Sequence, residues 1–487
     1  MSKRNLVKNI VWAAFSTIHV FCWIVAYFSL FIAIFIHYAW GNVDLTQLLF
    51  FAQTDLEGTD AILCIQAMVV CVLLPIVMTV FTIIIWRYAI KVKNKKAYAL
   101  LIYFDLILFS TSFYAVIQKF MPYVDFSKTN FYEQRYVNIN YPEQKYRRNV
   151  ILLFGESFET KHASLPEENL RVQDDDAIKF DDLTEGYAQR WTHGALFSSF
   201  TGVHIHYLSE YILHAFSDKL RLWSYDPEQN ILLSNKVGRN FDFDLPNMRF
   251  LSDILHYNGY QTLFVKGGSI YFAGTKRFLE NHGFDPENVY GYESFEEWKD
   301  FVKTKKWWGV DDKTMLQMFK EKITSLDKNK PFFAVGFTLD FHAGANPLFQ
   351  KKADMLKSNI ININDFISWF KKQDFYENTT LIILGDHKRM GRGVYPGGGI
   401  YNAFFNLPKE LLENLNTHRT FNQIDMFPTL LEIMGFELPD HQAGMGTSIF
   451  SSKRTLAEEY SYSEQMKIFT KVDDFYKKLW SKEIFLH

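Results

Sequence analysis

Three apolar runs dominate the first quarter of the chain. They cover residues 10–36, 61–86 and 98–117, and only Asp105 interrupts the third with a charge. Each run reaches the roughly 20 residues that an α-helix needs to cross a hydrocarbon core. The first is longer than the apolar part of a signal peptide and lacks a clear small-residue cleavage site. The pattern therefore predicts a membrane domain, residues 1–120, made of a signal anchor and two further transmembrane helices.

The charges between these runs indicate the orientation of the spans. The loop at 38–60 carries acidic residues but no Lys or Arg, whereas the loop after the second run is basic, with Arg87, Lys91, Lys93, Lys95 and Lys96. Cytoplasmic loops are enriched in Lys and Arg. We therefore expect the amino terminus and the second loop in the cytoplasm. Three crossings then place the rest of the chain on the periplasmic or extracellular side of a bacterial cytoplasmic (inner) membrane.

Two polar side chains, His19 and Asp105, fall within the predicted spans. Ionisable groups at membrane depth are costly and often mark functional sites. The alternative is that each one pairs with a neighbouring span or faces an interface. We favour this alternative, because the chemistry of the chain is concentrated further along.

Short apolar runs alternate with helical stretches after residue 149. Residues 121–148 are polar and rich in Tyr, and we interpret them as a juxtamembrane linker. The runs that follow are rich in β-branched and aromatic residues and occur at 149–154, 261–265, 332–337 and 380–385. Such an alternation predicts an α/β domain with a mostly parallel central sheet. We expect this domain over 149–450, with a C-terminal extension, 451–487, that packs on it as a helix.

Polar side chains follow three of the predicted strands. They are Glu156, Asp340, His342, Asp386 and His387. A segment of small and hydroxyl residues that contains Thr192 lies between the first two strands. Functional loops of open α/β sheets gather at the carboxyl ends of the strands. Carboxylate and imidazole ligands suit a divalent ion such as Zn or Mn, and a metal beside a Thr hydroxyl makes that weak nucleophile usable.

Each of these residues has an ordinary structural explanation when taken alone. A Glu after a strand often begins a helix, and a Thr in a loop is most often a helix cap. An Asp-His pair after a strand is usually an exposed polar turn. The prediction of a functional site therefore depends on their conjunction at successive strand ends.

Composition narrows the possible classes of function. The 487 residues are 48% hydrophobic and 17% aromatic, and the formal net charge is -2. These values exclude a globally basic nucleic-acid binder and a disordered chain. The three cysteines, Cys22, Cys64 and Cys71, all lie in the predicted spans, so we expect no disulfide in the external domain.

Several motifs occur in one order along the predicted α/β domain. They are NVILLFGESFE (149–159), QRWTHGALFSSFTG (189–202), FVKGGSIYFAGTKRFLENHGFD (264–285), WGVDD (308–312), TLDFHAG (338–344), LGDHKRMG (384–391), QIDMFPTLLEIMG (423–435) and GMGTSIF (444–450). Together they resemble the alkaline phosphatase superfamily, and within it the lipoteichoic acid synthase and membrane phosphoglycerol transferase family, whose catalytic domain is sulfatase-like. The resemblance implies N-terminal transmembrane helices followed by an α/β alkaline-phosphatase-like domain. No Cys-x-Pro-x-Arg segment occurs, which excludes a formylglycine sulfatase.

The resemblance also implies roles for individual residues. One divalent ion, expected to be Mn with Mg or Zn as alternatives, would be held by Glu156, Thr192, Asp386 and His387. Thr192 would also be the nucleophile, and His342 would contact the phosphoryl oxygens or assist the leaving group. Contacts to a phosphate or headgroup are expected from Lys266, Arg277 and Trp308. The alternatives are a solvated strand end for Lys266 and a core aromatic for Trp308.

The chain departs from the family pattern at two places. His204 and His206 lie in a stretch that is more apolar in the relatives, so a second metal there is conceivable. The alternative is that they flank a helix or line an acceptor groove. Lys388 and Arg389 add positive charge after the metal pair, which suits an anionic donor or acceptor.

The function implied by the resemblance is a membrane-anchored, metal-dependent phosphoglycerol transferase. It would move phosphoglycerol from phosphatidylglycerol in the membrane to an external glycan or glycerophosphate polymer through a phospho-threonine intermediate. The alternatives are a phosphoethanolamine transferase, a hydrolase of phospholipid headgroups, and a catalytically inactive scaffold. The absence of external cysteines counts against the first, because those relatives usually carry disulfides. The intact Glu-Thr-Asp-His set counts against the scaffold, and the acceptor stays open.

Overall fold

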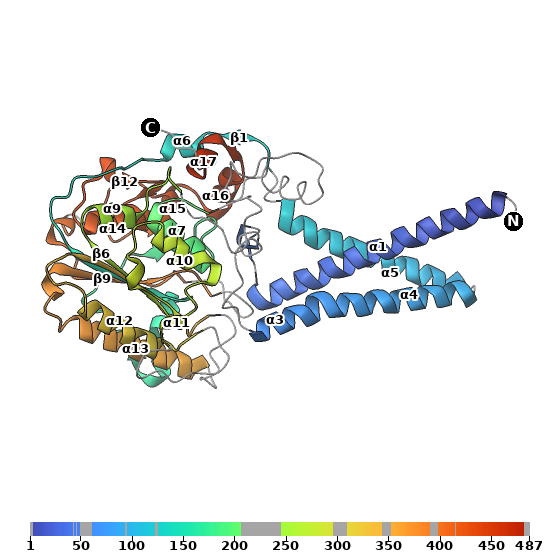
Figure 1. Cartoon of the computed structure of the whole chain (residues 1–487), viewed down its shortest axis with the longest axis horizontal. Coiled ribbons are helices and arrows are strands. Elements are labelled where there is room, and N and C mark those ends of the chain that lie inside the picture. The colour runs from blue at the N-terminus through green and yellow to red at the C-terminus, as the bar shows by residue number, and fades with distance from the viewer. Residues whose placement is uncertain are drawn as a thin grey trace. The chain divides into compact units, whose positions relative to one another are not determined.

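The computed structural model describes residues 3–41, 43–44, 46–48, 61–92, 95–121, 125–205, 245–295, 309–342, 352–389, 398–413 and 415–481. The chain divides into two compact units (Figure 1). The first, called here the helical unit, comprises Met1–Val43 and Asp60–Pro122. The second, the α/β unit, comprises Asp44–Thr59 and Tyr123–His487. Residues of the loop after the first helix thus belong to the α/β unit.

Long apolar helices make up the helical unit. They are α1 (Lys3–Trp40), the continuous run of α3 (Ala61–Met68), the π-helical η1 (Val69–Leu73) and α4 (Leu74–Val92), and α5 (Lys95–Phe120). The π-helical turn lies just before Pro75, whose ring and missing N–H disfavour regular α-helical bonding. Three stretches are long and apolar enough to cross a membrane, namely Thr17–Ala39, Leu63–Ala89 and Ala99–Gln118. The three predicted apolar helices are therefore confirmed.

The two polar residues of the predicted spans bond to each other inside this unit. Asp105 on α5 accepts hydrogen bonds from Nε2 of His19 at 3.2 Å and from Nε1 of Trp23 at 2.9 Å. The His19 ring stacks on Trp86 of α4, with the ring centroids 5.4 Å apart. The favoured expectation, that each polar group pairs with a neighbouring span, is confirmed. The cluster joins three helices.

A six-stranded sheet forms the centre of the α/β unit. Its strands are β2 (Asn149–Gly155), β6 (Gln261–Lys266), β7 (Val289–Tyr290), β8 (Phe332–Phe337), β9 (Thr379–Gly385) and β10 (Asn402–Phe405). Their order is β10-β9-β2-β8-β6-β7, and all neighbours are parallel except β10 with β9. The four predicted strands and the mostly parallel sheet are confirmed. The short edge strands β7 and β10 were not predicted, because neither has a long apolar run.

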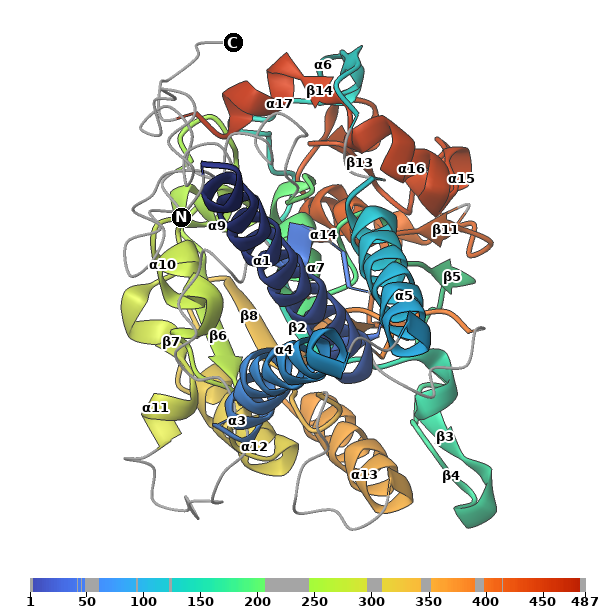
Figure 2. The ribbon, with the colours of Figure 1, turned by 90° about the vertical axis from the view of Figure 1, so that its right-hand side faces the viewer.

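Helices cover both faces of this sheet. Figures 1 and 2 place α12 (Asp312–Thr324) and α13 (Lys352–Phe370) on one face. The other face carries α7 (Thr192–Thr201), α9 (Leu251–Tyr257) and α14 (Met426–Ile433). Every residue of β2, β8 and β9 is buried. Burial on both faces explains why these strands are continuously apolar rather than alternating.

The predicted linker and the C-terminal extension pair with each other. Strand β1 (Lys128–Thr129) lies parallel to β14 (Val472–Asp473), and Val137 forms a bridge with Gly444. The described part of the expected linker is thus built into the α/β unit. The extension forms three short helices instead of one: α15 (Leu456–Glu459), α16 (Tyr462–Phe469) and α17 (Asp474–Leu479).

The remaining short elements lie around the sheet. They are α6 (Phe131–Arg135), β3 (Ser164–Leu165), β4 (Leu170–Arg171), β5 (Asp182–Leu183), α10 (Thr275–Glu280), α11 (Tyr292–Phe295), β11 (Thr420–Phe421), β12 (Gln442–Ala443) and β13 (Gly446–Thr447). Among them, α10 and α11 flank the β6 side of the sheet, where polar residues gather at the strand ends.

Candidate active site

A buried polar cluster lies at the carboxyl ends of β2 and β9. Ligand-type atoms of Glu156, Asp386 and His387 all lie within 4.8 Å of one another. The hydroxyl of Thr192, at the start of α7, donates to Oε2 of Glu156 at 3.2 Å and lies 3.4 Å from Nε2 of His387. The structure therefore brings together the four residues expected to hold a metal.

The register of the sheet explains this convergence. Strands β2 and β9 are parallel neighbours, and Gly155 pairs with Gly385, so both strands end at the same level. A Cβ at Gly385 would lie 2.1 Å from the carbonyl oxygen of Phe158, and only glycine permits this close approach. The residues after each strand are thereby placed side by side.

The turn after β2 is held in a strained conformation. Ser157 has φ of +50°, which costs a non-glycine residue about 1 kcal/mol or more. Its N–H donates to Oδ1 of Asp386 at 2.7 Å, and its hydroxyl donates to Oε1 of Glu156 at 2.8 Å. These bonds tie the turn to both carboxylates and fix their orientation. Sequence reasoning did not single out Ser157.

The segment before α7 packs tightly against the helix. The indole N–H of Trp191 donates to the carbonyl of Ala188 at 3.0 Å. A Cβ at Gly194 would lie 2.1 Å from that same carbonyl oxygen. A glycine is therefore required two residues after Thr192, where the helix turns against its own preceding loop.

The charges in the cluster are unbalanced. Burial, followed by the neighbouring Glu156, raises the pKa of Asp386 above its usual range. Burial alone would lower the pKa of His387, but Asp386 and Glu156 outweigh it and raise that pKa. Within the described residues, Oδ2 of Asp386 is buried and accepts no hydrogen bond. Two buried carboxylates with a spare acceptor fit a divalent cation.

The tautomer of His387 agrees with a ligand role. Its Nδ1 lies 2.8 Å from the carbonyl oxygen of Lys388, which can only accept a hydrogen bond. The Nδ1 atom therefore donates its proton to this carbonyl, and Nε2, which lies 3.6 Å from Glu156 and 3.3 Å from Asp386, is the nitrogen left to bind a metal. Carboxylate, hydroxyl and imidazole together suit Mn, Mg or Zn.

A cavity of about 50 Å³ opens beside this cluster. Among its lining residues are Glu156, Thr192, Lys266 and His342. The structure thus places two of the residues expected to contact a phosphate, Lys266 and His342, in the same cavity as the candidate nucleophile. Phe272 and Phe337 supply part of the apolar wall.

Lys266 lies at the end of β6 and lines this cavity rather than extending freely into solvent. Burial lowers its pKa to about 8, although Glu293 and Glu156 oppose the shift. Its Nζ lies 5.9 Å from the centroid of the Phe272 ring. At neutral pH the side chain is still mainly a cation, and its proton is held more weakly than that of an exposed lysine.

Two histidines near Thr192 are structural. Nε2 of His193 lies 2.8 Å from the hydroxyl of Thr275, and burial lowers the pKa of His193 to about 3. His204 is buried with its ring 4.4 Å from that of Phe469, and burial likewise lowers its pKa to about 3. The conceivable second metal at His204 is not supported, because the described residues form no metal-type group there. His206 lies outside the described residues.

Of the other two residues expected to contact substrate, the structure describes only Arg277. Arg277 is exposed on α10 and does not line the cavity. Trp308 lies outside the described residues. Both roles remain predictions.

A buried carboxylate network supports the loop that carries His342. Asp312, the first residue of α12, accepts the N–H of Leu339 at 2.5 Å and that of Asp340 at 3.1 Å with Oδ1. Its Oδ2 accepts from Nδ2 of Asn359 at 3.1 Å. Burial and the nearby Asp340 raise the pKa of Asp312 well above its usual range. Sequence reasoning quoted Asp312 within a motif but assigned it no role.

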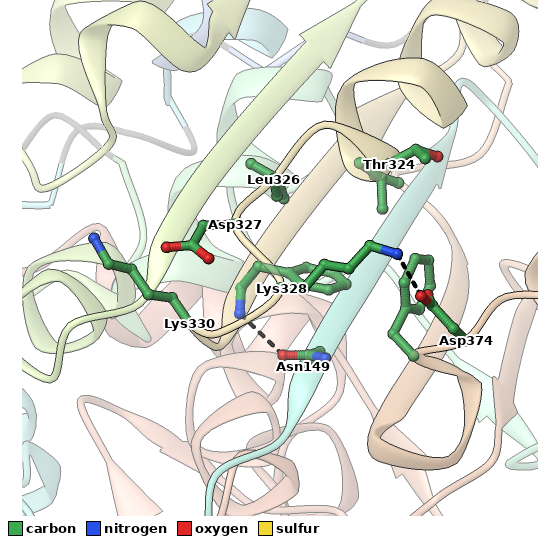
Figure 3. Close-up of a pocket in the computed structure, with 10 residues that line it drawn as sticks. Asn149, Thr324, Leu326, Asp327, Lys328, Lys330 and Asp374 are labelled. Carbon is green, nitrogen blue, oxygen red and sulfur yellow. Dashed lines mark hydrogen bonds and ion pairs between the residues drawn. The ribbon is translucent and has the colours of Figure 1, made fainter.

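Another cavity, of about 210 Å³, lies at the amino ends of β2 and β8 (Figure 3). Two of its charged side chains, Lys328 and Asp374, form an ion pair with each other. Asn149 there accepts the N–H of Phe332 at 3.0 Å. This edge is opposite to the cluster around Thr192 and offers no comparable group of ligands.

Comparison with known proteins identifies relatives of the α/β unit. A curated phosphoglycerol transferase I from Xanthomonas campestris is 26% identical over 334 residues, which cover 64% of this chain and 44% of the relative. The chain thus spans less than half the length of that protein. An alkaline phosphatase superfamily structure from Vibrio parahaemolyticus is 19% identical, with a TM-score of 0.42 over 68% of this chain and 77% of that chain.

A second solved structure is the lipoteichoic acid synthase LtaP from Listeria monocytogenes. It is 15% identical, with a TM-score of 0.41 over 62% of this chain and 75% of that chain. Residues 148–436 match the sulfatase family, and this range contains β2, α7, β6, β8 and β9 with their polar ends. The expected sulfatase-like domain is therefore confirmed. Because the match covers more than half of the chain, this protein belongs to the sulfatase family.

Proposed function

We propose that the protein is a phosphotransferase that moves phosphoglycerol from phosphatidylglycerol to a hydroxyl of an external glycan or glycerophosphate polymer. One observation carries this proposal. The hydroxyl of Thr192 lies at a cavity, 3.2 Å from the buried carboxylate of Glu156 and 3.4 Å from Nε2 of the buried His387 imidazole. The family and the curated phosphoglycerol transferase relative support the same reaction class.

We propose that Glu156, Thr192, Asp386 and His387 hold one divalent ion, with Mn as the first candidate. When bound, such an ion lowers the pKa of a coordinated hydroxyl and offsets negative charge on phosphoryl oxygens. The unbalanced carboxylates and the position of His387 Nε2, the ring nitrogen that faces them, support this assignment.

The protein's own residues suit a two-step transfer. In the first step Thr192 gives its hydroxyl proton to the Glu156 carboxylate that it already contacts. The Thr192 oxygen forms a bond to phosphorus, and the bond from phosphorus to the diacylglycerol oxygen breaks. Diacylglycerol leaves after taking up a proton, for which His342 at the cavity is the proposed donor. In the second step an acceptor hydroxyl displaces the phosphoglycerol and restores Thr192. The ammonium group of Lys266 offsets charge on the phosphoryl oxygens.

The electrostatics of the cavity favour glycerol over ethanolamine in the donor headgroup. Lys266 brings a cation to the cavity wall, and a like-charged ammonium group would be repelled there. The nearby carboxylate of Glu293 accepts hydrogen bonds from the hydroxyl of Ser269 and from the N–H of Ile270, and it does not line the cavity. A neutral polyol meets no such repulsion.

We further propose that the three apolar helices cross a bacterial cytoplasmic membrane and that the α/β unit acts on its outer side. The helices have the required length and composition, and the basic loop between the second and third supports this orientation. Anchoring would keep the active site at high effective concentration relative to a lipid donor.

The test is mass spectrometry of the purified full chain after incubation with Mn and vesicles of either phosphatidylglycerol or phosphatidylethanolamine. We expect a phosphoglycerol adduct on Thr192 with the first lipid only. The adduct should be absent in Thr192→Ala and retained in Thr160→Ala, which removes an exposed threonine. A phosphoethanolamine adduct would overturn the assigned donor. Release of diacylglycerol by Thr192→Ala at the wild-type rate would overturn the nucleophile.

A further inference from the structure

A continuous set of contacts links the loop after α1 to the metal-type cluster. It begins at Asp44, passes through Tyr462 on α16, Arg190 and Glu185, and ends at the backbone of Lys388. All of these residues belong to the α/β unit, although they come from four separate parts of the sequence. No step of the proposed reaction uses any of them.

The first contact anchors the loop. The hydroxyl of Tyr462 lies 3.1 Å from Oδ1 and 3.2 Å from Oδ2 of Asp44, so it donates to this carboxylate. Burial raises the pKa of Tyr462, which therefore keeps the proton that it donates. Asp44 is only 7% exposed, and the nearby Thr46 and Gln47 are 1% and 4% exposed. These residues of the loop between two apolar helices are thus buried, and they belong to the α/β unit.

The second contact reaches the segment that precedes the nucleophile. The guanidinium carbon of Arg190 lies 3.6 Å from the centroid of the Tyr462 ring, a close cation–π contact. Nε of Arg190 lies 3.4 Å from Oε2 of Glu185. Arg190 is therefore held between an aromatic face and a carboxylate, two residues before Thr192.

The third contact reaches the metal-type ligand His387. Oε1 of Glu185 accepts the N–H of Lys388 at 3.0 Å. The backbone carbonyl of Lys388 in turn accepts the Nδ1–H of His387 at 2.8 Å. Groups that hold the second nitrogen of a ligand histidine fix its tautomer and ring orientation. Glu185 therefore fixes the backbone of the residue that in turn orients the His387 ring.

Helix α16 holds the nucleophile segment at a second point. The side chain of Gln465 is buried, and its Oε1 accepts the N–H of Tyr187 at 3.1 Å. Its Nε2 donates to the carbonyl of Tyr460 at 3.0 Å. The segment from Glu185 to Thr192 is thus bonded to one short helix through both Tyr462 and Gln465.

We infer that Asp44, Tyr462 and Arg190 are positioning residues for the proposed phosphoryl transfer, holding Thr192 and His387 in register. This inference rests on the proposed function. It assigns a role to α16, in the C-terminal extension, and to the loop between the first two apolar helices. Among the described residues, none of α16 or of this loop lines the cavity, and both act through the segment 185–192 and the Lys388 backbone.

The test uses the full chain in detergent, with Mn affinity, thermal stability, and kcat and KM for phosphatidylglycerol as readouts. Tyr462→Leu removes both ring and hydroxyl. We expect it to weaken Mn binding by about 10- to 100-fold, as loss of an outer partner of a ligand does, and to lower kcat with little change in KM. Tyr462→Phe keeps the ring beneath Arg190 and should lose much less Mn affinity and kcat than Tyr462→Leu. Tyr460→Phe, the same change two residues earlier, is the matched control and should resemble wild type.

A double-mutant cycle tests the link from the loop. Asp44→Asn and Tyr462→Phe both weaken one hydrogen bond, so the double variant should lose no more kcat than the stronger single variant. Additive losses would overturn the link, as would a Tyr462→Leu variant with lower thermal stability but unchanged Mn affinity and kcat. If the wild type does not turn over phosphatidylglycerol but Tyr462→Leu still weakens Mn binding, the proposed function is overturned. The positioning role of Tyr462 toward the metal-type cluster then stands.

Discussion

The hydroxyl of Thr192 lies 3.4 Å from Nε2 of His387, although 195 positions separate the two residues. One begins helix α7, and the other follows strand β9. The contact exists because β2 and β9 end at the same level and the segment before α7 packs against that edge. The proposed nucleophile and a metal-type ligand from distant parts of the sequence thereby share one buried site.

Metal binding should stabilise the protein measurably. Asp386 and Glu156 repel each other at a buried position, and a bound cation relieves this repulsion. At 100 times its Kd, Mn should add about 2.7 kcal/mol to the free energy of unfolding. A thermal-shift titration with Mn, reversed by a chelator, measures the effect. Asp386→Asn should lose most of it, whereas Asp354→Asn, an exposed change on α13, should keep it. A full Mn-dependent shift in Asp386→Asn would contradict the assigned site.

Lys266 should set a basic limit to activity. Its pKa is lowered to about 8, so the ammonium form is fully present below that pH and is lost as the pH rises through it. We expect kcat/KM to fall between pH 7.5 and 9, by roughly tenfold per pH unit above the pKa. The measurement is kcat/KM as a function of pH. Lys266→Arg should move the limit upward because arginine stays charged. Lys266→Met should have a lower kcat/KM that does not change with pH over this range. If kcat/KM of this variant still falls above pH 8, the decline belongs to another group.

Asp312 should make stability depend on pH. Its pKa is raised in the folded protein, so the folded state binds more protons than the unfolded chain above about pH 4. The contribution of Asp312 to stability is therefore greatest at or below that pH and declines as the pH rises. Asp312→Asn should reduce the decline in melting temperature between pH 5 and 8. The amide of Asn359 can rotate to face the new side chain, because its Oδ1 has no hydrogen-bond partner among the described residues. An unchanged slope would contradict the prediction.

The polar cluster of the helical unit should matter for stability rather than catalysis. Asp105→Ala leaves Nε1 of Trp23 and Nε2 of His19 without their acceptor. We expect a loss of about 1–2 kcal/mol in detergent or bilayer and an unchanged kcat per folded molecule. Ser110→Ala, an exposed change on the same helix, serves as control. A fall in kcat without a fall in melting temperature would instead indicate a functional role for Asp105.

Local patterns in the sequence were enough to predict the elements that carry most of the site. The three apolar helices and the strands β2, β6, β8 and β9 follow from runs of apolar residues whose length and bounds are local properties. The polar residues after these strands could be expected to meet, because parallel strands share one carboxyl edge. The resemblance to a known family then assigned them roles.

Other features have no local signal. Strand β1 pairs with β14 across most of the chain, and β10 closes the sheet with only four residues. The link from Asp44 through Tyr462 to Arg190 joins a loop, a C-terminal helix and the nucleophile segment. Each of these residues looks like an ordinary surface group in the sequence.

The sequence by itself determined the apolar spans, the α/β alternation and the types of residue at the strand ends, because hydrophobic periodicity and turn chemistry act over short distances. Only the tertiary structure decided which side chains meet. The register of β2 with β9 brings Glu156 to Asp386 and His387, and packing buries Asp44 beside Tyr462. Such contacts depend on how distant segments fit together, and the free energy of that fit is spread over the whole core.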